Sequence, residues 1–321
     1  NTPNTLYSNN GDGTFSPTTG LAADTGVSLN PSWVDYDVDG DLDLYVVNAQ
    51  GPNVLYRNDG GTAFVATGQA ADPSGTSTAD PDGNRGHAWG DYDNDGYPDV
   101  YVGQASLDGT LHNPLYKNNG DGTFTNVNDG DALGVGASLL TTRNVAWGDY
   151  DGDGDLDPYL ITATTNVLYE NSAGVFTDVA AVVGLDDTNS GGNGAWADYD
   201  GDGDLDLHVG GATATALYRN DGAVANWLAV DLVSLSSAPN GFGARTTAVA
   251  GGIRQTRHID EKSGERLYFG LGAAATIDSL IVEWPSGVVS EQVAVSANQP
   301  LTVTEPLSVA FDGTTGDPLL S

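Results

Sequence analysis

The stretch that most constrains the fold is a nine-residue acidic loop at residues 91–99, which the chain repeats in three other places. In this copy aspartates stand at positions 1, 3, 5 and 9, and Gly96 stands at position 6, directly before an apolar strand. Carboxylates at this spacing repel one another unless a cation lies among them. Oxygen ligands, in a chain with no cysteine, favour a hard divalent ion over a thiolate-binding metal.

The loop resembles the first part of an EF-hand calcium loop, in which a glycine at position 6 makes the sharp turn. It is not an EF-hand, because position 12 is Val102 instead of a bidentate glutamate. The flanks at 87–89 and 100–102 also have the aromatic and β-branched character of strands. We therefore expect a β-hairpin loop wrapped around a divalent ion. Calcium fits better than magnesium, since it accepts a larger and less regular shell of carboxylates.

Internal repetition extends beyond the loops, whose first aspartates are separated by 56, 58 and 49 residues. A tryptophan stands two residues before each loop, and Leu-Tyr-x-Asn motifs followed by glycine-rich turns lie between the loops. Each repeat thus predicts a strand ending in Trp-x-Asp, the loop, a second strand, a Leu-Tyr strand, a hairpin and a fourth strand. Such a unit cannot bury both faces alone, and radial stacking of units gives a β-propeller. We interpret the tryptophans as blade core.

These elements, over residues 4–222, resemble the FG-GAP/VCBS repeats of integrin-type calcium-binding propellers. The resemblance implies about four Ca²⁺ ions, with side-chain oxygens from positions 1, 3, 5 and 9 and the backbone carbonyl of position 7. The metal-binding residues it implies are Asp35, Asp37, Asp39, Asp41 and Asp43; Asp91, Asp93, Asp95, Tyr97 and Asp99; Asp149, Asp151, Asp153, Asp155 and Asp157; and Asp198, Asp200, Asp202, Asp204 and Asp206.

The chain has five Leu-Tyr elements but only four acidic loops, so we expect an all-β fold with a propeller of about four to five blades in residues 1–222. Strands near Leu6 and Phe15 could complete the last blade, or could pair with strands after Trp227 to build a fifth. An open or partner-closed assembly is a further alternative.

After residue 222 the repeats stop, and short alternating strands broken by Gly, Pro and Ser follow in residues 223–305. This part resembles the UnbV/ASPIC domain that ends cartilage-acidic-protein-like secreted proteins. The similarity lies in the segments 243–245, 251–252, 269–272 and 284–287. Together with the repeats, it makes the chain similar to a bacterial-type member of that family. We expect residues 306–321 to form a loosely ordered tail.

The charge of the chain restricts its partners, because ten basic residues face 44 acidic ones and the formal net charge is −34. Such a chain is a poor ligand for nucleic acid or anionic membrane surfaces. No apolar run is long enough for a transmembrane helix, so we expect no membrane insertion. The first residues lack the features of a signal peptide, which makes this the mature form of any exported protein. Calcium is plentiful outside cells, so we expect a secreted, extracellular, cell-surface or periplasmic protein.

A second possible site comprises Arg85, His87 and Arg143. The arginines each stand six residues before a loop, and two such cations at equivalent positions could face each other near a ring entrance and bind an anion. The alternative is an ion pair with an aspartate of a neighbouring blade. His87 could serve as a zinc ligand or general base, although a lone histidine is more often simply packed or exposed.

The sequence constrains the function of the chain less than it constrains the fold. Our first hypothesis is a binding or adhesion module for an extracellular protein or glycan, in which calcium rigidifies the blade hairpins. Calcium could also bridge a partner's carboxylate or a sugar hydroxyl. The alternative is a carbohydrate-processing enzyme of the lyase or dehydratase kind with a central pocket, and a third hypothesis is a purely structural extracellular component. No catalytic triad or cofactor fingerprint stands out, which favours a protein that is not an enzyme.

Overall fold

A computed structural model gives the structure of the chain, which divides into two compact units. The first comprises residues 1–150 and 155–222, and the second residues 151–154 and 223–321. The structure describes residues 4–18, 21, 27–49, 52–60, 63–67, 84–104, 113–127, 141–188, 191–211, 214–222, 225–259, 266–307, 309–311 and 318–320.

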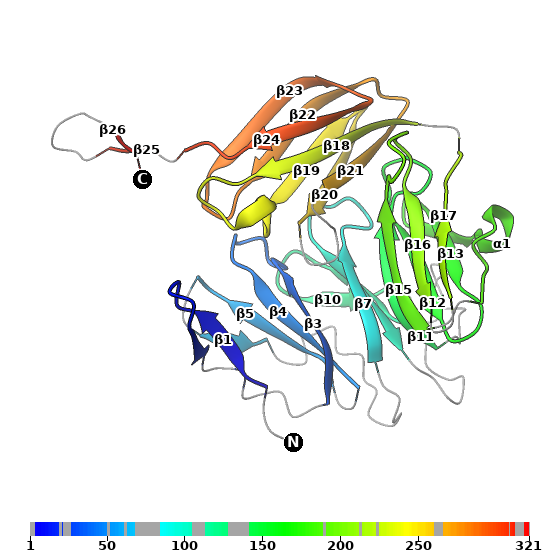
Figure 1. Ribbon diagram of the computed structural model, residues 1–321, viewed down its shortest axis with the longest axis horizontal. Coiled ribbons are helices and arrows are strands. Elements are labelled where there is room, and N and C mark those ends of the chain that lie inside the picture. The colour runs from blue at the N-terminus through cyan, green and yellow to red at the C-terminus, as the bar shows by residue number, and fades with distance from the viewer. Residues whose placement is uncertain are drawn as a thin grey trace. The chain divides into compact units, whose positions relative to one another are not determined.

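The described residues confirm the all-β class, with several small antiparallel sheets and very little helix. In the first unit, a hairpin of β1 (Leu6–Asn9) and β2 (Phe15–Thr18) precedes four sheets (Figure 1). The sheets are β3 (Ser28–Val34), β4 (Asp43–Asn48), β5 (Val54–Asn58) and β6 (Phe64–Ala66); β7 (Asn84–Gly90), β8 (Asp99–Gln104), β9 (Leu115–Asn118) and β10 (Phe124–Asn126); β11 (Thr142–Gly148), β12 (Asp157–Thr162), β13 (Val167–Ser172) and β14 (Val175–Asp178); and β15 (Gly191–Ala197), β16 (Asp206–Gly211) and β17 (Thr215–Tyr218). A short helix, α1 (Ala180–Val183), follows β14.

Within each of these sheets the strands pair with their neighbours in chain order, and an acidic loop joins the first strand to the second. The second strands of the first three sheets are buried along their whole length, which fits their apolar sequences. The strands expected from the Trp-x-Asp, Leu-Tyr and Phe motifs are therefore present where those residues are described.

Neighbouring sheets of the first unit pack through one repeated aromatic contact. Tyr101 of β8 is 0% exposed and meets the Trp147 ring of the next sheet edge-on, with ring centroids 6.3 Å apart. The Trp147 indole N–H also donates to the Ala88 carbonyl at 3.1 Å. Equivalent ring contacts join the other neighbouring sheets, in the pairs Tyr45–Trp89 and Tyr159–Trp196. These tryptophans thus pack between sheets, as the sequence predicts.

The β1–β2 hairpin lies beside the first sheet, because Leu6 packs against the cluster formed by Leu44, Val46 and Tyr56. Among the described residues, its two strands pair only with each other. The closed ring of a propeller is not shown by these contacts, and ring closure stays a prediction.

The second unit contains two larger sheets, and β18 and β24 form the one parallel pair among its described strands. The three-stranded sheet has the order β21-β18-β24 and the four-stranded sheet the order β20-β19-β22-β23. Their bounds are β18 (Asn226–Val233), β19 (Arg245–Ala250), β20 (Ile253–His258), β21 (Arg266–Gly272), β22 (Thr276–Glu283), β23 (Val289–Ser296) and β24 (Gln299–Thr304), with a 3₁₀ turn, η1, at Pro239–Gly241.

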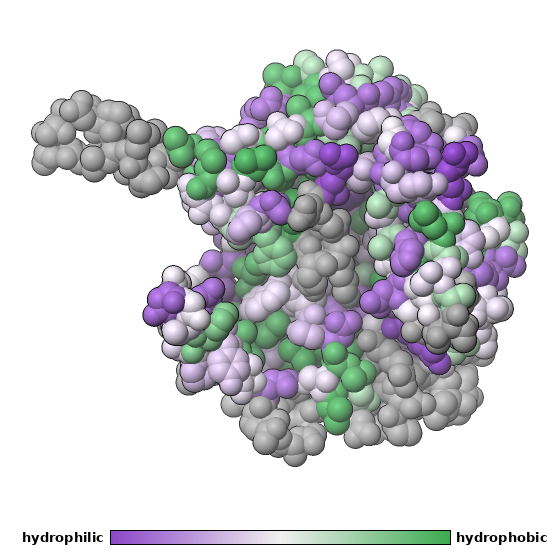
Figure 2. All heavy atoms as spheres, in the orientation of Figure 1, coloured by the Kyte–Doolittle hydropathy of each residue, from purple (hydrophilic) through white to green (hydrophobic). Residues whose placement is uncertain are grey.

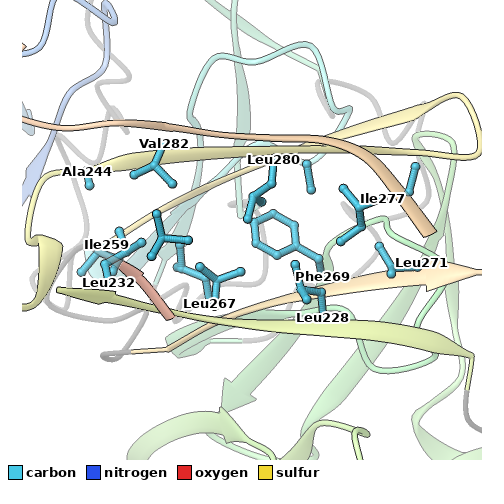
Figure 3. Packing of buried hydrophobic residues seen from close by; sticks show 14 of the residues in the cluster. Leu228, Leu232, Ala244, Ile259, Leu267, Phe269, Leu271, Ile277, Leu280 and Val282 are labelled. Atoms are coloured by element: carbon cyan, nitrogen blue, oxygen red, sulfur yellow. The ribbon is translucent and has the colours of Figure 1, made fainter. Parts of the chain in front are cut away.

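Apolar side chains from both sheets of this unit meet in one core (Figure 3). Phe269 and Leu228 come from the three-stranded sheet, Leu280 and Ile277 come from the four-stranded one, and all four are 0% exposed. A core of this kind, with side chains from two inner faces, is that of a β-sandwich.

In the segment expected to form a tail, β25 (Val309–Phe311) and β26 (Pro318–Leu320) pair as a small antiparallel hairpin. On the face of the molecule shown in Figure 2, hydrophilic and apolar residues are intermingled. Within the described residues, no helix has the length and apolar character needed to cross a membrane.

Candidate metal sites in the acidic loops

In three of the four loops, the first aspartate organises the loop backbone. In the second loop, the carboxylate of Asp91 accepts the backbone N–H groups of Asp95 and Gly96, both at 2.9 Å. Asp35 and Asp198 make the equivalent pair of bonds in the first and fourth loops. This carboxylate is therefore held at the centre of its own loop, with both oxygens fixed in direction.

The turn requires left-handed backbone at two positions of every loop. Position 6 is always glycine, with φ near +100°, which other residues rarely adopt. Position 4 is also left-handed, and its residues are Val38, Asn94, Gly152 and Gly201. Val38 differs from the other three residues, because a β-branched side chain at positive φ strains the backbone.

The last aspartate of each loop joins the loop to the Leu-Tyr-x-Asn strand. In the second loop, Asp99 accepts the N–H of Tyr92 at 3.1 Å through one carboxylate oxygen and the N–H of Asn118 at 2.8 Å through the other. The same two bonds recur in all four loops. Both oxygens of position 9 thus already have backbone donors, which makes this aspartate part of the fold as well as a candidate ligand.

The carboxylates predicted as ligands converge in each loop. Oxygens from three aspartates lie within 4.8 Å of one another in every loop, and positions 1 and 3 contribute in all four. Position 5 completes the first cluster and position 9 the other three. The clusters are Asp35, Asp37 and Asp39; Asp91, Asp93 and Asp99; Asp149, Asp151 and Asp157; and Asp198, Asp200 and Asp206.

The side chains at position 7 point toward the turn that follows the Leu-Tyr-x-Asn strand. A Cβ built on Gly60 would lie 2.8 Å from the Asp41 carboxylate, and one on Gly120 would lie 2.7 Å from the Tyr97 ring. In the third loop, the Asp155 carboxylate accepts the N–H of Ala173 at 2.8 Å. The side chain of position 7 thus packs on the hairpin, and the predicted use of its backbone carbonyl stays a prediction.

Two buried carboxylate oxygens favour a cation in these loops. Asp37 Oδ1 and Asp93 Oδ1, both at position 3, are inaccessible to solvent and have no hydrogen-bond donor among the described residues. A buried charged oxygen without a partner is costly, and a metal ion would satisfy it. The donor set consists of carboxylate oxygens only, which is the chemistry that calcium and magnesium prefer.

Burial raises the pKa values of several loop carboxylates. Burial raises the pKa of Asp35 to about 6, and the neighbouring Asp39 and Asp37 charges add to the effect. Burial also raises the pKa of Asp43 to about 8 and that of Asp99 well above the usual range. In the fourth loop, burial and the Asp202 charge raise the pKa of Asp204 to about 6. These carboxylates lack compensating positive charge, which a divalent ion supplies.

The second possible site is only partly described. His87 is 0% exposed, its Nε2 lies 2.6 Å from Ser32 Oγ, and its ring packs edge-on against Tyr45. A substrate cannot reach this buried imidazole, so His87 packs between sheets. Arg143 lies on β11 with an exposed side chain, whereas the side chain of Arg85 lies outside the described residues. Whether the two arginines face each other and bind an anion, or pair with aspartates of neighbouring blades, therefore stays a prediction.

The asparagine of the Leu-Tyr-x-Asn motif is a structural residue whose role sequence reasoning missed. The side-chain amide of Asn118 donates to the carbonyls of Tyr36 at 2.7 Å and Pro98 at 3.1 Å. Tyr36 belongs to the previous acidic loop and Pro98 to the loop of its own sheet, so one amide connects two loops. The available signal was the recurrence of asparagine in every Leu-Tyr motif.

Comparison with known protein families identifies both parts of the chain. A model described as FG-GAP-like repeat matches residues 1–46 and 35–102, and a model described as ASPIC and UnbV matches residues 234–309. The chain therefore contains FG-GAP-like repeats and a C-terminal ASPIC and UnbV domain, as the sequence motifs predict.

The curated relatives are cartilage acidic proteins. The chain is 32% identical to cartilage acidic protein 1 of Mus musculus over 170 residues, 30% identical to that of Homo sapiens over 170 residues, and 29% identical to that of Xenopus tropicalis over 175 residues. Each match covers 49% of this chain and 24% of the relative. The chain thus spans about a quarter of the length of the curated relatives it matches.

Proposed function

We propose that the chain is an extracellular binding module in which calcium, held in the four acidic loops, rigidifies a propeller-like array of sheets. The observation that carries this proposal is the pair of orphaned buried oxygens, Asp37 Oδ1 and Asp93 Oδ1, at equivalent positions of two clustered loops. The FG-GAP-like repeats in the same part of the chain support the same chemistry.

Calcium would act on the hairpins that carry the loops. Each loop joins the first two strands of a sheet, and its last aspartate is bonded to the third strand. Bringing several carboxylates together without a counter-ion is unfavourable, so an ion among them stabilises the folded state over the unfolded one. The expected result is a set of firmly held turns, on which exposed side chains can be presented to a partner.

The partner class we propose is an extracellular protein or glycan. The relatives named cartilage acidic protein and the integrin-like character of the repeats support a location outside the cell, where calcium is plentiful. The formal charge of −34 disfavours nucleic acid and anionic membrane surfaces as partners. His87, the candidate general base, is buried, so this binding role is favoured over the carbohydrate-processing alternative.

The test is thermal unfolding of the whole chain in EGTA, in calcium and in magnesium. Ligand linkage predicts that calcium at about 100 times its Kd adds about 2.7 kcal/mol per occupied site. We expect a higher Tm in calcium than in EGTA or magnesium, and a smaller gain in the variant Asp37→Asn. An identical Tm in calcium and EGTA would refute calcium stabilisation. Calcium-dependent capture of a member of a glycan or extracellular-protein panel, without turnover, tests the binding role separately.

A further inference from the structure

One residue outside each acidic loop is placed beside it by the fold. In the four Leu-Tyr-x-Asn motifs that follow an acidic loop, the asparagine N–H donates to the position-9 aspartate of that loop, which fixes the preceding residue x next to the loop. In chain order, residue x is Arg57, Lys117, Glu170 and Arg219. Four similar loops therefore have neighbours of different charge.

Lys117 makes the most direct contact with its loop. Its ammonium donates to Asp93 Oδ2 and, at 2.8 Å, to Asp95 Oδ2. Asp93 belongs to the carboxylate cluster of the second loop, and its other oxygen, Oδ1, is the buried one without a donor among the described residues. The ammonium and an ion in this cluster would therefore share one carboxylate.

The two arginines are coupled more weakly to their loops. Arg219 Nη1 lies 3.6 Å from Asp200 Oδ2, and the guanidinium also pairs with Asp221, outside the loop. Arg57 forms its ion pair with Asp59, at 2.8 Å, with both side chains exposed. Exposed pairs are strongly screened by water and salt, so these cations disturb an ion in the loop less than Lys117 does.

The third loop has charges of both signs beside it, because Arg257 Nη2 donates to the Gly154 carbonyl of this loop at 3.3 Å. Glu170 occupies the x position, and its carboxylate accepts the Tyr150 hydroxyl at 2.9 Å. Tyr150 directly follows Asp149, the first aspartate of the loop. This glutamate favours a cation in the loop and the Arg257 guanidinium disfavours one, so the two charges act in opposite directions.

We propose that residue x lowers the cation affinity of a loop where its positive charge bonds directly to the loop carboxylates, so that the second loop, with Lys117, binds calcium most weakly of the four. The physical reason is Coulombic, because a positive neighbour competes with the ion and a negative neighbour attracts it. This inference rests on the proposed calcium binding. The inference extends the proposed calcium binding by assigning different calcium affinities to loops whose aspartates have the same spacing.

The experiment is equilibrium dialysis of the whole chain against calcium, which yields the number of bound ions and their stepwise affinities. We expect Lys117→Gln to tighten the weakest step at least tenfold. Arg57→Gln is the matched control, with an expected change below threefold. Asp93→Asn should remove the weakest step and leave the tighter ones in place, which assigns that step to the second loop.

The outcomes separate this inference from the proposed function. Binding of calcium by the wild type with an unchanged weakest step in Lys117→Gln would overturn the inference and leave calcium binding intact. The same holds if Asp93→Asn removes the tightest step. Absence of any bound calcium in the wild type would overturn both.

Discussion

The side-chain amide of Asn171 donates to the backbone carbonyl of Tyr92, 2.9 Å away and 79 residues earlier in the chain. The same amide donates to Leu156 of its own loop at 3.1 Å, and the Asn171 N–H donates to Asp157. The third strand of one sheet is thereby bonded to the acidic loops of its own sheet and of the previous one. Sheet packing and loop conformation therefore depend on each other.

The first prediction concerns this connection. Asn171→Ala should lower the free energy of unfolding by about 2–4 kcal/mol, because two buried carbonyl groups lose their donor. Asn119→Ala is the control, since the Asn119 side chain is exposed and its bonds to Thr123 and Thr125 stay within one hairpin, and its effect should stay within about 0.5 kcal/mol. Urea unfolding in calcium measures both. Equal effects of the two substitutions would contradict the role given to Asn171.

The second prediction separates the scaffold aspartate from the ligand aspartate of the first loop. Asp43 is 0% exposed and accepts two backbone N–H groups, so Asp43→Asn should cost about 2–3 kcal/mol even in EGTA. Asp37 has the orphaned oxygen, so Asp37→Asn should leave stability in EGTA nearly unchanged or slightly raised, and should reduce the gain from calcium. Urea unfolding of both variants, in EGTA and in calcium, tests this distinction. A large loss for Asp37→Asn in EGTA would refute the distinction.

The sequence predicted the parts of this structure that depend on local pattern. Alternating apolar residues after each Asp-Gly turn predicted strands such as β8, and the acid spacing predicted the carboxylate clusters. It did not predict that Asn118 would bond to Tyr36, because the carbonyl of a residue 82 positions away carries no side-chain signature. The burial of His87 was likewise out of reach, since it depends on Ser32 and Tyr45 of another sheet.

The third prediction concerns backbone strain in the first loop. Val38 has φ of +60°, where the second loop has Asn94 at +58° and the other two have glycine. Asparagine tolerates this conformation and a β-branched side chain does not, so Val38→Asn should stabilise the protein by about 1 kcal/mol. Val65→Asn, at an exposed strand position, is the control and should give no stabilisation. The midpoint of urea unfolding measures the stability of both variants. A less stable Val38→Asn variant would contradict the backbone strain assigned to Val38.

The fourth prediction concerns the pH dependence of the ASPIC and UnbV domain. Burial acts to raise the pKa of Glu305, but hydrogen bonds from the Ser286 hydroxyl and from the Ser236 and Ser237 amides outweigh it and lower the pKa to about 2. Because the folded-state pKa lies below the usual value near 4.5, this carboxylate stabilises the fold fully above that value. The stabilisation is lost as the pH falls from about 4.5 toward 2.

Hydrogen exchange in EGTA, corrected for the intrinsic pH dependence of exchange, tests this carboxylate without interference from metal binding. Protection of the Leu235, Ser236 and Ser237 amides, which donate to Glu305, should fall across that pH range. Glu305→Gln should lower protection at neutral pH, by about 2 kcal/mol in opening free energy, and should remove most of the pH dependence. Protection that is the same in wild type and variant at pH 7 would contradict the role of the charge.

The most direct test of the central claim is a crystal structure of the chain grown in calcium, with anomalous scattering used to locate the ions. The account predicts anomalous peaks within the four acidic loops, each in contact with the aspartates at positions 1 and 3. Loops that hold no ion in ample calcium, with the Asp37 and Asp93 oxygens bonded to protein or water instead, would contradict it.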